Sequence, residues 1–323
     1  MLFRSKFKRE DIGVVYNPEI GKDNSLLLKE ICNYDAIAIR SDTKLDSVVL
    51  NKAIKLKVIG RAGIGVDNID LDSASSKGIV VMNTPFGNAI TTAEHTIAMI
   101  FAAARNIPAA NQSTQSGRWE KKKFIGIELS RKKLGIVGVG NIGSIVASLA
   151  QSIGMEIIAY DPFLSDERAK NLKIYKTKDL NDLLSQSDVV TLHLPKNENT
   201  RNIISRENIY KMKKGSILVN CARGGLVEEI AVAEAIKTKH LSAAAFDVFL
   251  EEPATSNPLF GLKNVICTPH LGASTAEAQE KVSFQIADQI INYLKNGAIV
   301  NALNAPSIDP KEALLLNPWI RLA

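Results

Sequence analysis

The stretch KLGIVGVGNIGSIVASLAQSIG, from Lys133 to Gly154, decides the fold. An apolar strand-like run is followed by a helical pattern, and between them Gly138, Gly140 and Gly143 stand in the order G-x-G-x-x-G. The first glycine suits a tight turn, the second lets a pyrophosphate approach the backbone, and the third lets helix and strand pack closely. A phosphate placed there meets the positive end of the helix. The stretch therefore predicts a dinucleotide-binding unit, although a glycine turn alone can be purely structural.

A carboxylate follows at the distance that a dinucleotide site requires. The apolar run from Ile157 to Tyr160 predicts a second strand, and it ends in Asp161, 161 − 143 = 18 residues after the last glycine. A carboxylate there accepts hydrogen bonds from a ribose diol and repels a 2′-phosphate. No arginine follows it, so NAD is favoured over NADP.

Strand-like runs alternate with helical patterns along the rest of the chain, which is typical of parallel sheets covered by helices. Two such series predict an α/β protein with two doubly wound parallel-sheet domains, one a Rossmann dinucleotide-binding domain and the other flavodoxin-like. We expect residues 87–285 to form the NAD-binding domain, and residues 1–86 with 286–323 to form a discontinuous substrate-binding domain. Long helices are expected from Thr91 to Arg105 and from Ser274 to Gly297, bridging the domains. The predicted strands are IGVVYN, AIAIR, LKVIG and GIVVMN in the first series, and KLGIVG, EIIAYD, DVVTLHLP, SILVNCA, SAAAFDVF and NVICTPH in the second.

The composition excludes several classes of protein. The net charge of +6 is modest and its Lys and Arg residues are spread along the 323 residues, so nucleic-acid binding is not indicated. No apolar run is long enough to span a bilayer, and no apolar stretch follows the basic start, so neither a membrane span nor a signal peptide is expected. Cys32, Cys221 and Cys267 are too few and too far apart for a disulfide framework or a metal site. We therefore expect a cytoplasmic protein without a bound metal.

Three side chains with complementary chemistry fall at the ends of predicted strands. Arg223 follows SILVN, Glu252 lies after SAAAFDVF, and His270 follows NVICT. Ligands of doubly wound sheets bind at the carboxyl ends of the strands. Oxidation of a 2-hydroxy acid needs a cation for the substrate carboxylate, a base for the hydroxyl proton and a carboxylate that supports the base. The three residues are therefore predicted to be catalytic.

Each of these residues also has a structural interpretation. An arginine beside a turn is commonly a surface charge, a Glu-Glu pair a solvated face, and Pro-His part of a loop. Among the other histidines, His95 fits a packed or interdomain residue, His193 fits either the cofactor crevice or a structural role, and His240 fits the end of a helix. The three candidates support one another because they fall at the same edge of a dinucleotide-binding sheet.

The sequence resembles the D-isomer-specific 2-hydroxyacid dehydrogenases over nearly its whole length. The resemblance rests on the segments GRAGIGVDNID, NTPFGNAITTAEH, LGIVGVGNIG, NCARGGLVEE, DVFLEEP and TPHLGAST. GVGNIG and ARGG are shared across the family, whereas GRAGIGVDN together with PHLGAST is more specific to members that act on phosphoglycerate. The resemblance implies Arg223, Glu252 and His270 as catalytic residues and selects Glu252, before the proline, over Glu251.

The resemblance also implies the remaining contacts of the cofactor and the substrate. For NAD, it places Asn141 and Ile142 at the pyrophosphate, Asp161 at the ribose and Asp247 at the carboxamide, with the nicotinamide side completed by Leu194, Cys221, Ala222, Gly272 and Ala273. For the substrate, it places Arg61, Ala62 and Gly63 at the carboxylate end and Arg40 at the phosphate. Lys121, in RWEKKKF, would reach the active site of a neighbouring subunit, where some relatives have arginine.

The expected activity is the NAD-dependent oxidation of 3-phospho-D-glycerate, the first committed step towards serine, by a homodimer or tetramer. Two alternatives stay open at this point. The same chemistry could serve another D-2-hydroxy acid such as glycerate, hydroxypyruvate or lactate, and oxidation of formate or phosphite fits less well. An NAD-sensing protein of the kind found among transcriptional corepressors would retain the same three catalytic residues.

Overall fold

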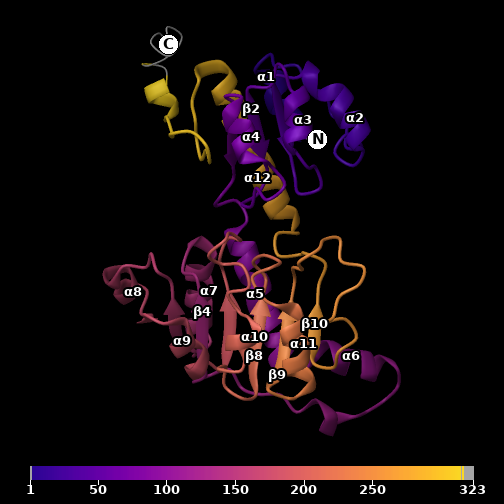
Figure 1. Cartoon of the computed structure of the whole chain (residues 1–323), viewed down its shortest axis with the longest axis vertical. Helices are drawn as coiled ribbons and strands as arrows, with labels where there is room; N and C mark the ends of the chain where they lie inside the picture. The colour runs from indigo at the N-terminus through magenta and orange to yellow at the C-terminus, as the bar shows by residue number, and fades with distance from the viewer. Residues whose placement is uncertain (1, 314, 316–323) are drawn as a thin grey trace. The chain divides into compact units, whose positions relative to one another are not determined.

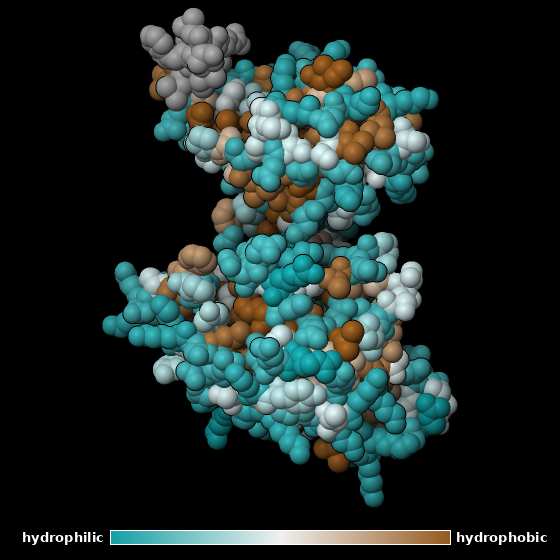
Figure 2. Space-filling view, viewed as in Figure 1, coloured by the Kyte–Doolittle hydropathy of each residue, from teal (hydrophilic) through white to brown (hydrophobic). Residues whose placement is uncertain are grey.

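The computed structural model describes residues 2–313 and 315, which form two compact units (Figure 1). Unit 1 comprises residues 1–88 and 275–323, and unit 2 comprises residues 89–274. The chain therefore passes from unit 1 to unit 2 and back again. Polar side chains cover most of the surface of each unit that Figure 2 shows.

Unit 1 is a three-layer α/β unit around a parallel sheet with the strand order β1-β2-β3. Side chains that alternate along β2 explain the two covered faces, because Ile59 faces a core with helices α2 to α4 while Val58 faces a core with α1 and α12. The elements are α1 Leu2–Arg9, α2 Asn24–Glu30, η1 Ile31–Asn33, β1 Ala36–Ile39, α3 Ser47–Lys52, β2 Val58–Arg61, α4 Leu71–Ser76, β3 Val80–Asn83 and α12 Ala276–Asn296.

Unit 2 is built on a seven-stranded parallel sheet with the order β10-β9-β8-β7-β4-β5-β6. Helices α5, α7 and α8 cover one face, and α9, α10 and α11 cover the other (Figure 1). The elements are α5 Ala89–Ala104, α6 Ile107–Gln115, η2 Lys121–Phe124, β4 Lys133–Val137, α7 Asn141–Ser152, β5 Glu156–Tyr160, α8 Asp166–Asn171, β6 Tyr175–Thr177, α9 Leu180–Gln186, β7 Val189–Leu192, α10 Arg206–Ile209, β8 Ser216–Asn220, α11 Glu229–Lys237, β9 Leu241–Phe246 and β10 Val265–Cys267. The order reverses at β4, between β7 and β5, and such a switch point opens a crevice for a ligand.

The α/β class with two parallel sheets is confirmed, with three local differences. Residues 12–17 are not a strand, because Val15 and Tyr16 are 67% and 63% exposed and the segment pairs with no strand among the described residues. The short strand β6 was not predicted. Helix α12 begins at Ala276 and belongs wholly to unit 1, so the second boundary lies at 274/275 rather than at the expected 285/286. The reason is that residues 276–285 continue the same helix as Ile286 and Ile290, which are buried in the core of unit 1. The expected segment 286–323 extends beyond the described residues.

The two long helices form as the sequence predicts, and their ends have local causes. Helix α12 starts where the Thr275 hydroxyl accepts a hydrogen bond from the N–H of Ala278, a cap that contributes about 1 kcal/mol. It ends at Gly297, whose φ of +71° suits a left-handed C-cap. Helix α5 packs along β8, β9 and β10, which brings its side chains to the carboxyl ends of those strands.

Candidate active site

The glycine-rich turn between β4 and α7 has the geometry of a phosphate cradle. Gly138 has a φ of +95°, and a Cβ on Gly143 would stand 2.1 Å from the Gly138 carbonyl oxygen, so both positions require glycine. A Cβ on Gly140 would instead meet no heavy atom within 4 Å. Helix α7 begins there without a side-chain cap. The open space beside the uncapped N–H groups therefore fits a pyrophosphate.

Asp161 follows β5 directly and stands against this turn. One carboxylate oxygen accepts the N–H of Val139 at 2.8 Å, and the other accepts the N–H of Phe163 at 2.8 Å. The two bonds fix the orientation of the carboxylate, and each oxygen keeps acceptor capacity for a ribose hydroxyl. The predicted carboxylate thus lies beside the predicted glycine turn.

His270 and Glu252 form a hydrogen-bonded pair. His270 Nδ1 lies 2.6 Å from Glu252 Oε2, and Glu252 Oε1 accepts the N–H of Phe249 at 3.0 Å. The side chains remain 47% and 35% exposed, so a substrate can reach the imidazole. The structure therefore brings together two residues that lie 18 positions apart, at the loops following β9 and β10.

Each member of the pair favours the charged form of the other, as the directions of the pKa shifts indicate. The hydrogen bond to Glu252 raises the pKa of His270 above its ordinary value, against burial and the nearby positive charge of Arg223. Burial alone would raise the pKa of Glu252, but the hydrogen bonds from His270 and Phe249 outweigh it and the pKa is lowered. Since Glu252 is ionised and can only accept, the proton of the neutral imidazole lies on Nδ1 and the lone pair on Nε2.

Arg223 is carried by a rigid turn after β8. The Asn220 side chain bridges this turn, because its amide group donates to the Arg223 carbonyl at 2.9 Å and its oxygen accepts the N–H of Ala222 at 3.1 Å. Gly224 follows, and a Cβ there would stand 1.7 Å from the Phe249 carbonyl oxygen. The guanidinium donates to the Ala222 carbonyl at 2.7 Å and is close enough to His270 to oppose its protonation.

Asp247 is a fully buried carboxylate just after β9. It accepts hydrogen bonds from the Thr268 hydroxyl at 2.6 Å and from the N–H groups of Leu271 and Gly272 at 2.7 and 2.8 Å. Burial alone would raise its pKa, but the side chains of His95 and Thr268 and the Leu271 N–H outweigh burial and lower it. The loop that carries His270 is therefore folded around an ionised Asp247.

His95 is the residue near this site that the sequence analysis did not select. Its Nε2 atom lies 3.2 Å from Asp247 Oδ1 and 3.4 Å from Thr268 Oγ1. The sequence predicts His95 to be a packed or interdomain residue of an amphipathic helix. That prediction fits its surroundings but does not include its contact with Asp247. No spacing rule links His95 to Asp247, so only the polar residues of the first half of the helix, where His95 stands beside Glu94 and several threonines, could have drawn attention to it.

The other predicted cofactor residues of unit 2 all follow the carboxyl ends of strands. Asn141 and Ile142 start α7, Leu194 lies two residues beyond β7, Cys221 and Ala222 follow β8, and Gly272 and Ala273 lie beyond β10. Burial raises the pKa of the Cys221 thiol to about 12, which excludes it as a nucleophile at neutral pH. His193 is neutral, because burial lowers its pKa to about 3.

The predicted substrate residues of unit 1 also meet at one sheet edge. Ile39 and Arg61 are paired in register, and the N–H of Ala62 donates to the Ile39 carbonyl at 2.9 Å, so Arg40 follows β1 beside Arg61, the last residue of the adjacent β2. Gly63 has a φ of +145° beside the Arg61 guanidinium. Lys121 is exposed in η2 of unit 2, and among the described residues no hydrogen bond or ion pair joins it to His270, Glu252 or Arg223.

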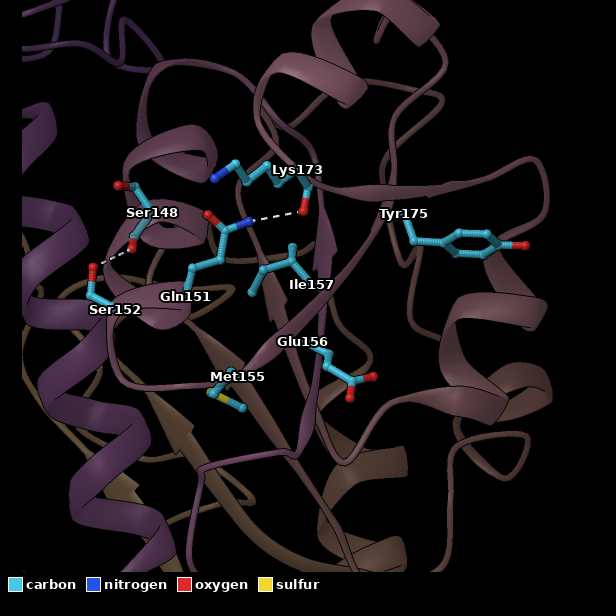
Figure 3. Close-up of a pocket in the computed structure, with 8 residues that line it drawn as sticks. All are labelled: Ser148, Gln151, Ser152, Met155, Glu156, Ile157, Lys173 and Tyr175. Atoms are coloured by element: carbon cyan, nitrogen blue, oxygen red, sulfur yellow. Dashed lines mark hydrogen bonds between the residues drawn. The ribbon is translucent and has the colours of Figure 1, made fainter.

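A separate hollow of about 590 Å³ lies on unit 2 (Figure 3). Its lining comes from α7, from the start of β5 and from the segment that leads into β6, and it includes Ser148, Gln151, Ser152, Met155, Glu156, Ile157, Lys173 and Tyr175. Gln151 already donates to the Lys173 carbonyl, and the Ser152 hydroxyl to the Ser148 carbonyl. Met155 and Glu156 lie at the amino end of β5, whereas the cradle lies at the carboxyl end of β4. The hollow is therefore separate from the candidate active site.

The comparison with protein families assigns the chain to a class. Residues 97–272 match the family described as D-isomer specific 2-hydroxyacid dehydrogenase, NAD binding domain. This chain belongs to the D-isomer specific 2-hydroxyacid dehydrogenase family, and unit 2 carries its NAD-binding domain. Across residues 2–313 and 315, none of the helices is long and apolar enough to cross a membrane.

Individual relatives of this chain bear names that are more specific than the family name. The D-3-phosphoglycerate dehydrogenase of Archaeoglobus fulgidus is 47% identical over 96% of this chain and 59% of its own length. The enzyme of the same name from Methanocaldococcus jannaschii is 46% identical over 97% of this chain and 60% of its own length. This chain thus spans about three fifths of the length of these curated relatives. The NAD-dependent formate dehydrogenase of Staphylococcus aureus, solved in complex with NAD, superposes with a TM-score of 0.84 at 27% identity, over 95% of this chain and 93% of its own.

Proposed function

We propose that this chain oxidises 3-phospho-D-glycerate to 3-phosphohydroxypyruvate with NAD, a step of serine biosynthesis. The observation that carries the proposal is the 2.6 Å pair of His270 and Glu252 beside Arg223, on the parallel sheet whose strand β4 leads into a glycine-rich dinucleotide turn. The relatives at 46% and 47% identity bear the name of this activity. An imidazole, its carboxylate and a guanidinium are the groups that oxidation of a 2-hydroxy acid needs.

In the proposed mechanism, His270 is the general base. Its Nδ1 proton is held by Glu252, so the Nε2 lone pair is available for the proton of the substrate hydroxyl. The resulting imidazolium is stabilised by the ionised Glu252. Arg223 binds the substrate carboxylate through its planar, permanently charged guanidinium. NAD held at the glycine-rich turn between β4 and α7 would supply the acceptor for the hydride from C2 of the substrate.

We assign the remaining binding roles on the same basis. For NAD, Asn141 and Ile142 would contact the pyrophosphate, Asp161 the ribose and Asp247 the carboxamide, through its oxygen Oδ2, which accepts the N–H of Gly272. The nicotinamide side would be completed by Leu194, Cys221, Ala222, Gly272 and Ala273. For the substrate, the carboxylate end would be bound by Arg61, Ala62 and Gly63, and the phosphate by Arg40 and by Lys121 of a neighbouring subunit.

The first experiment measures NADH formation from 3-phospho-D-glycerate while the keto product is trapped chemically. Glycerate, lactate and 2-hydroxyglutarate are compared under the same conditions, with His270→Gln as the control for the chemistry. Preference for the phosphorylated acid supports the proposal. Preference for another acid keeps the catalytic residues and overturns the substrate, whereas NAD binding without turnover favours an NAD-sensing protein.

We further propose that the chain forms a homodimer or a tetramer in the cytoplasm. Apolar side chains are exposed on α5, on α6 and in the segment that follows, with Phe101 at 37%, Ile107 at 51%, Trp119 at 86% and Ile125 at 80%. Exposed apolar groups of this kind mark protein interfaces. Sedimentation of the chain and of a Trp119→Ser variant tests the first part, since a monomeric parent chain contradicts it. The three cysteines, all free thiols, fit a reducing compartment.

A further inference from the structure

The starting observation is that a polar side chain of α5, that of His95, contacts the loop that carries His270. His95 is a helical residue with a side chain only 20% exposed, and its Nε2 atom lies 3.2 Å from the Oδ1 atom of the fully buried Asp247. The other described donors to this carboxylate are Thr268, Leu271 and Gly272, which all belong to the loop that carries His270. His95 therefore links the loop to a helix of the surrounding fold.

The hydrogen-bonding partners decide which atom carries the proton. The Thr268 hydroxyl donates to Asp247 Oδ1 at 2.6 Å, so the Thr268 oxygen can only accept from His95. The Asp247 carboxylate is also an acceptor only. The hydrogen of the His95 ring must therefore lie on Nε2, and this N–H group points at an ionised carboxylate. Hydrogen bonds to charged groups are stronger than neutral ones.

Asp247 in turn fixes the main chain of the catalytic histidine. The N–H of His270 donates to the Asp247 carbonyl at 2.8 Å, and the next two N–H groups donate to the Asp247 carboxylate. His270 itself adopts a φ of +56°, a conformation that a non-glycine residue keeps only where its surroundings impose it. A shift of Asp247 would therefore move His270 relative to Glu252.

We propose that His95 is a positioning residue for the His270–Glu252 pair: it holds Asp247 from α5, and Asp247 holds the loop that places the imidazole. The role of the pair in catalysis rests on the proposed function, whereas its geometry does not. The charged or titratable groups around His270 are Glu252, Asp247 and Arg223, and the buried Cys221 lies near Asp247. Substitution of His95 removes none of these three charged groups, but it removes a hydrogen bond that lowers the pKa of Asp247.

The test compares His95→Leu with His95→Gln, because the glutamine amide can replace the Nε2 donor and leucine cannot. In His95→Leu the hydrogen bond between His270 and Glu252 loosens, so the pKa of His270 falls towards its ordinary value and kcat falls about tenfold, as expected when a charge-assisted bond is lost. His95→Gln restores both. The pKa of His270 is followed by NMR of ring-labelled histidine, which the chain's four histidines make simple to assign.

The matched control is His240→Leu. His240 lies just before β9 begins, with its ring centroid 5.0 Å from that of Tyr210 and the two rings tilted by 52°, whereas Asp247 follows the opposite end of that strand. This variant leaves the pKa of His270 and kcat unchanged. A merely structural His95 would lower the melting temperature alone, so an unchanged His270 pKa in folded His95→Leu overturns the inference. If the parent chain does not oxidise 3-phospho-D-glycerate but the pKa shift and its rescue are seen, the proposed function fails and the inference stands.

Discussion

At the scale of single residues, the environment of His270 sets the pH range of the proposed reaction. Its pKa is raised, chiefly by the hydrogen bond to Glu252. Only the neutral imidazole can accept the hydroxyl proton, and it predominates above the raised pKa. For oxidation, kcat/KM should therefore fall as the pH drops through the pKa of His270. For reduction, which needs the imidazolium, it should fall as the pH rises through the same value.

Glu252→Gln tests this dependence. The substitution removes the negative charge that raises the pKa of His270, so the acid limb of the oxidation profile should move to lower pH. The amide also supports the imidazolium poorly, and kcat should fall on the order of 10²-fold. Profiles of kcat/KM against pH for both proteins provide the check, with Glu251→Gln as the matched control on the preceding residue. If the acid limb of the Glu252→Gln profile stayed at the same pH, a group other than His270 would control it.

At the scale of elements, the turn between β4 and α7 separates two roles of glycine. A Cβ on Gly143 would collide with the Gly138 carbonyl oxygen at 2.1 Å, whereas a Cβ on Gly140 would enter empty space. The φ of Gly140 is −75°, which other residues adopt readily. Gly143 thus serves the packing of helix on strand, and Gly140 serves the proposed pyrophosphate.

Alanine at each position should have opposite consequences. Gly140→Ala should raise the Kd for NADH about tenfold or more, a cost of about 1.4 kcal/mol, and leave the melting temperature unchanged. Gly143→Ala should lower the melting temperature, because backbone must move to admit the methyl group. Fluorescence titration with NADH and thermal unfolding measure the two effects. Unchanged NADH affinity in Gly140→Ala would remove this turn from the cofactor site.

The strands show which parts of the fold can be predicted from the sequence. Apolar runs that become central strands, such as Val189–Leu192 and Ser216–Asn220, are predictable because they are buried on both faces. The edge strand Tyr175–Thr177 has one exposed and one half-buried residue, so its composition carries little signal. Residues 12–17 have a strand-like composition but no strand to pair with. The catalytic candidates were predictable from strand ends, whereas the contact of His95 with Asp247 depends on how α5 packs on the sheet.

At the scale of the whole molecule, the hydrophobic cores follow the division into units. The two large clusters of unit 2 contain residues between Ala93 and Cys267 alone, and the clusters of unit 1 contain none of them. Each unit therefore has the burial needed for an independent fold. The residues proposed for NAD and for proton transfer lie in unit 2, and Arg40 and Arg61 lie in unit 1.

A fragment of residues 89–274 should accordingly fold alone and bind NADH. We expect its Kd to stay within about tenfold of the value for the whole chain, while turnover is lost because the residues of unit 1 are missing. Circular dichroism, thermal unfolding and NADH titration of the fragment supply the measurements. A fragment that does not fold cooperatively would show that unit 2 depends on unit 1.

Arg40→Ala tests the assignment of the phosphate to unit 1. Loss of the guanidinium should raise KM for 3-phospho-D-glycerate by about tenfold or more, whereas KM for unphosphorylated glycerate should change little. Steady-state kinetics with both acids measure the difference, and Lys44→Ala, which removes another positive charge from unit 1, is the control. Equal changes for the two acids would place Arg40 away from the phosphate.

The placement of α12 in unit 1 has a consequence for the order of events during synthesis. Residues 89–274 leave the ribosome complete, whereas the β2 face that carries Gly60 stays uncovered until Ile286 and Ile290 have been added. Domains generally fold as units while the chain emerges, with the first-made domain folding first. In this chain that order is reversed. Translation of unit 1 starts first, but its core cannot be completed until α12 has been synthesised, after the whole of unit 2. Until then, apolar strands of unit 1 stay exposed to chaperones.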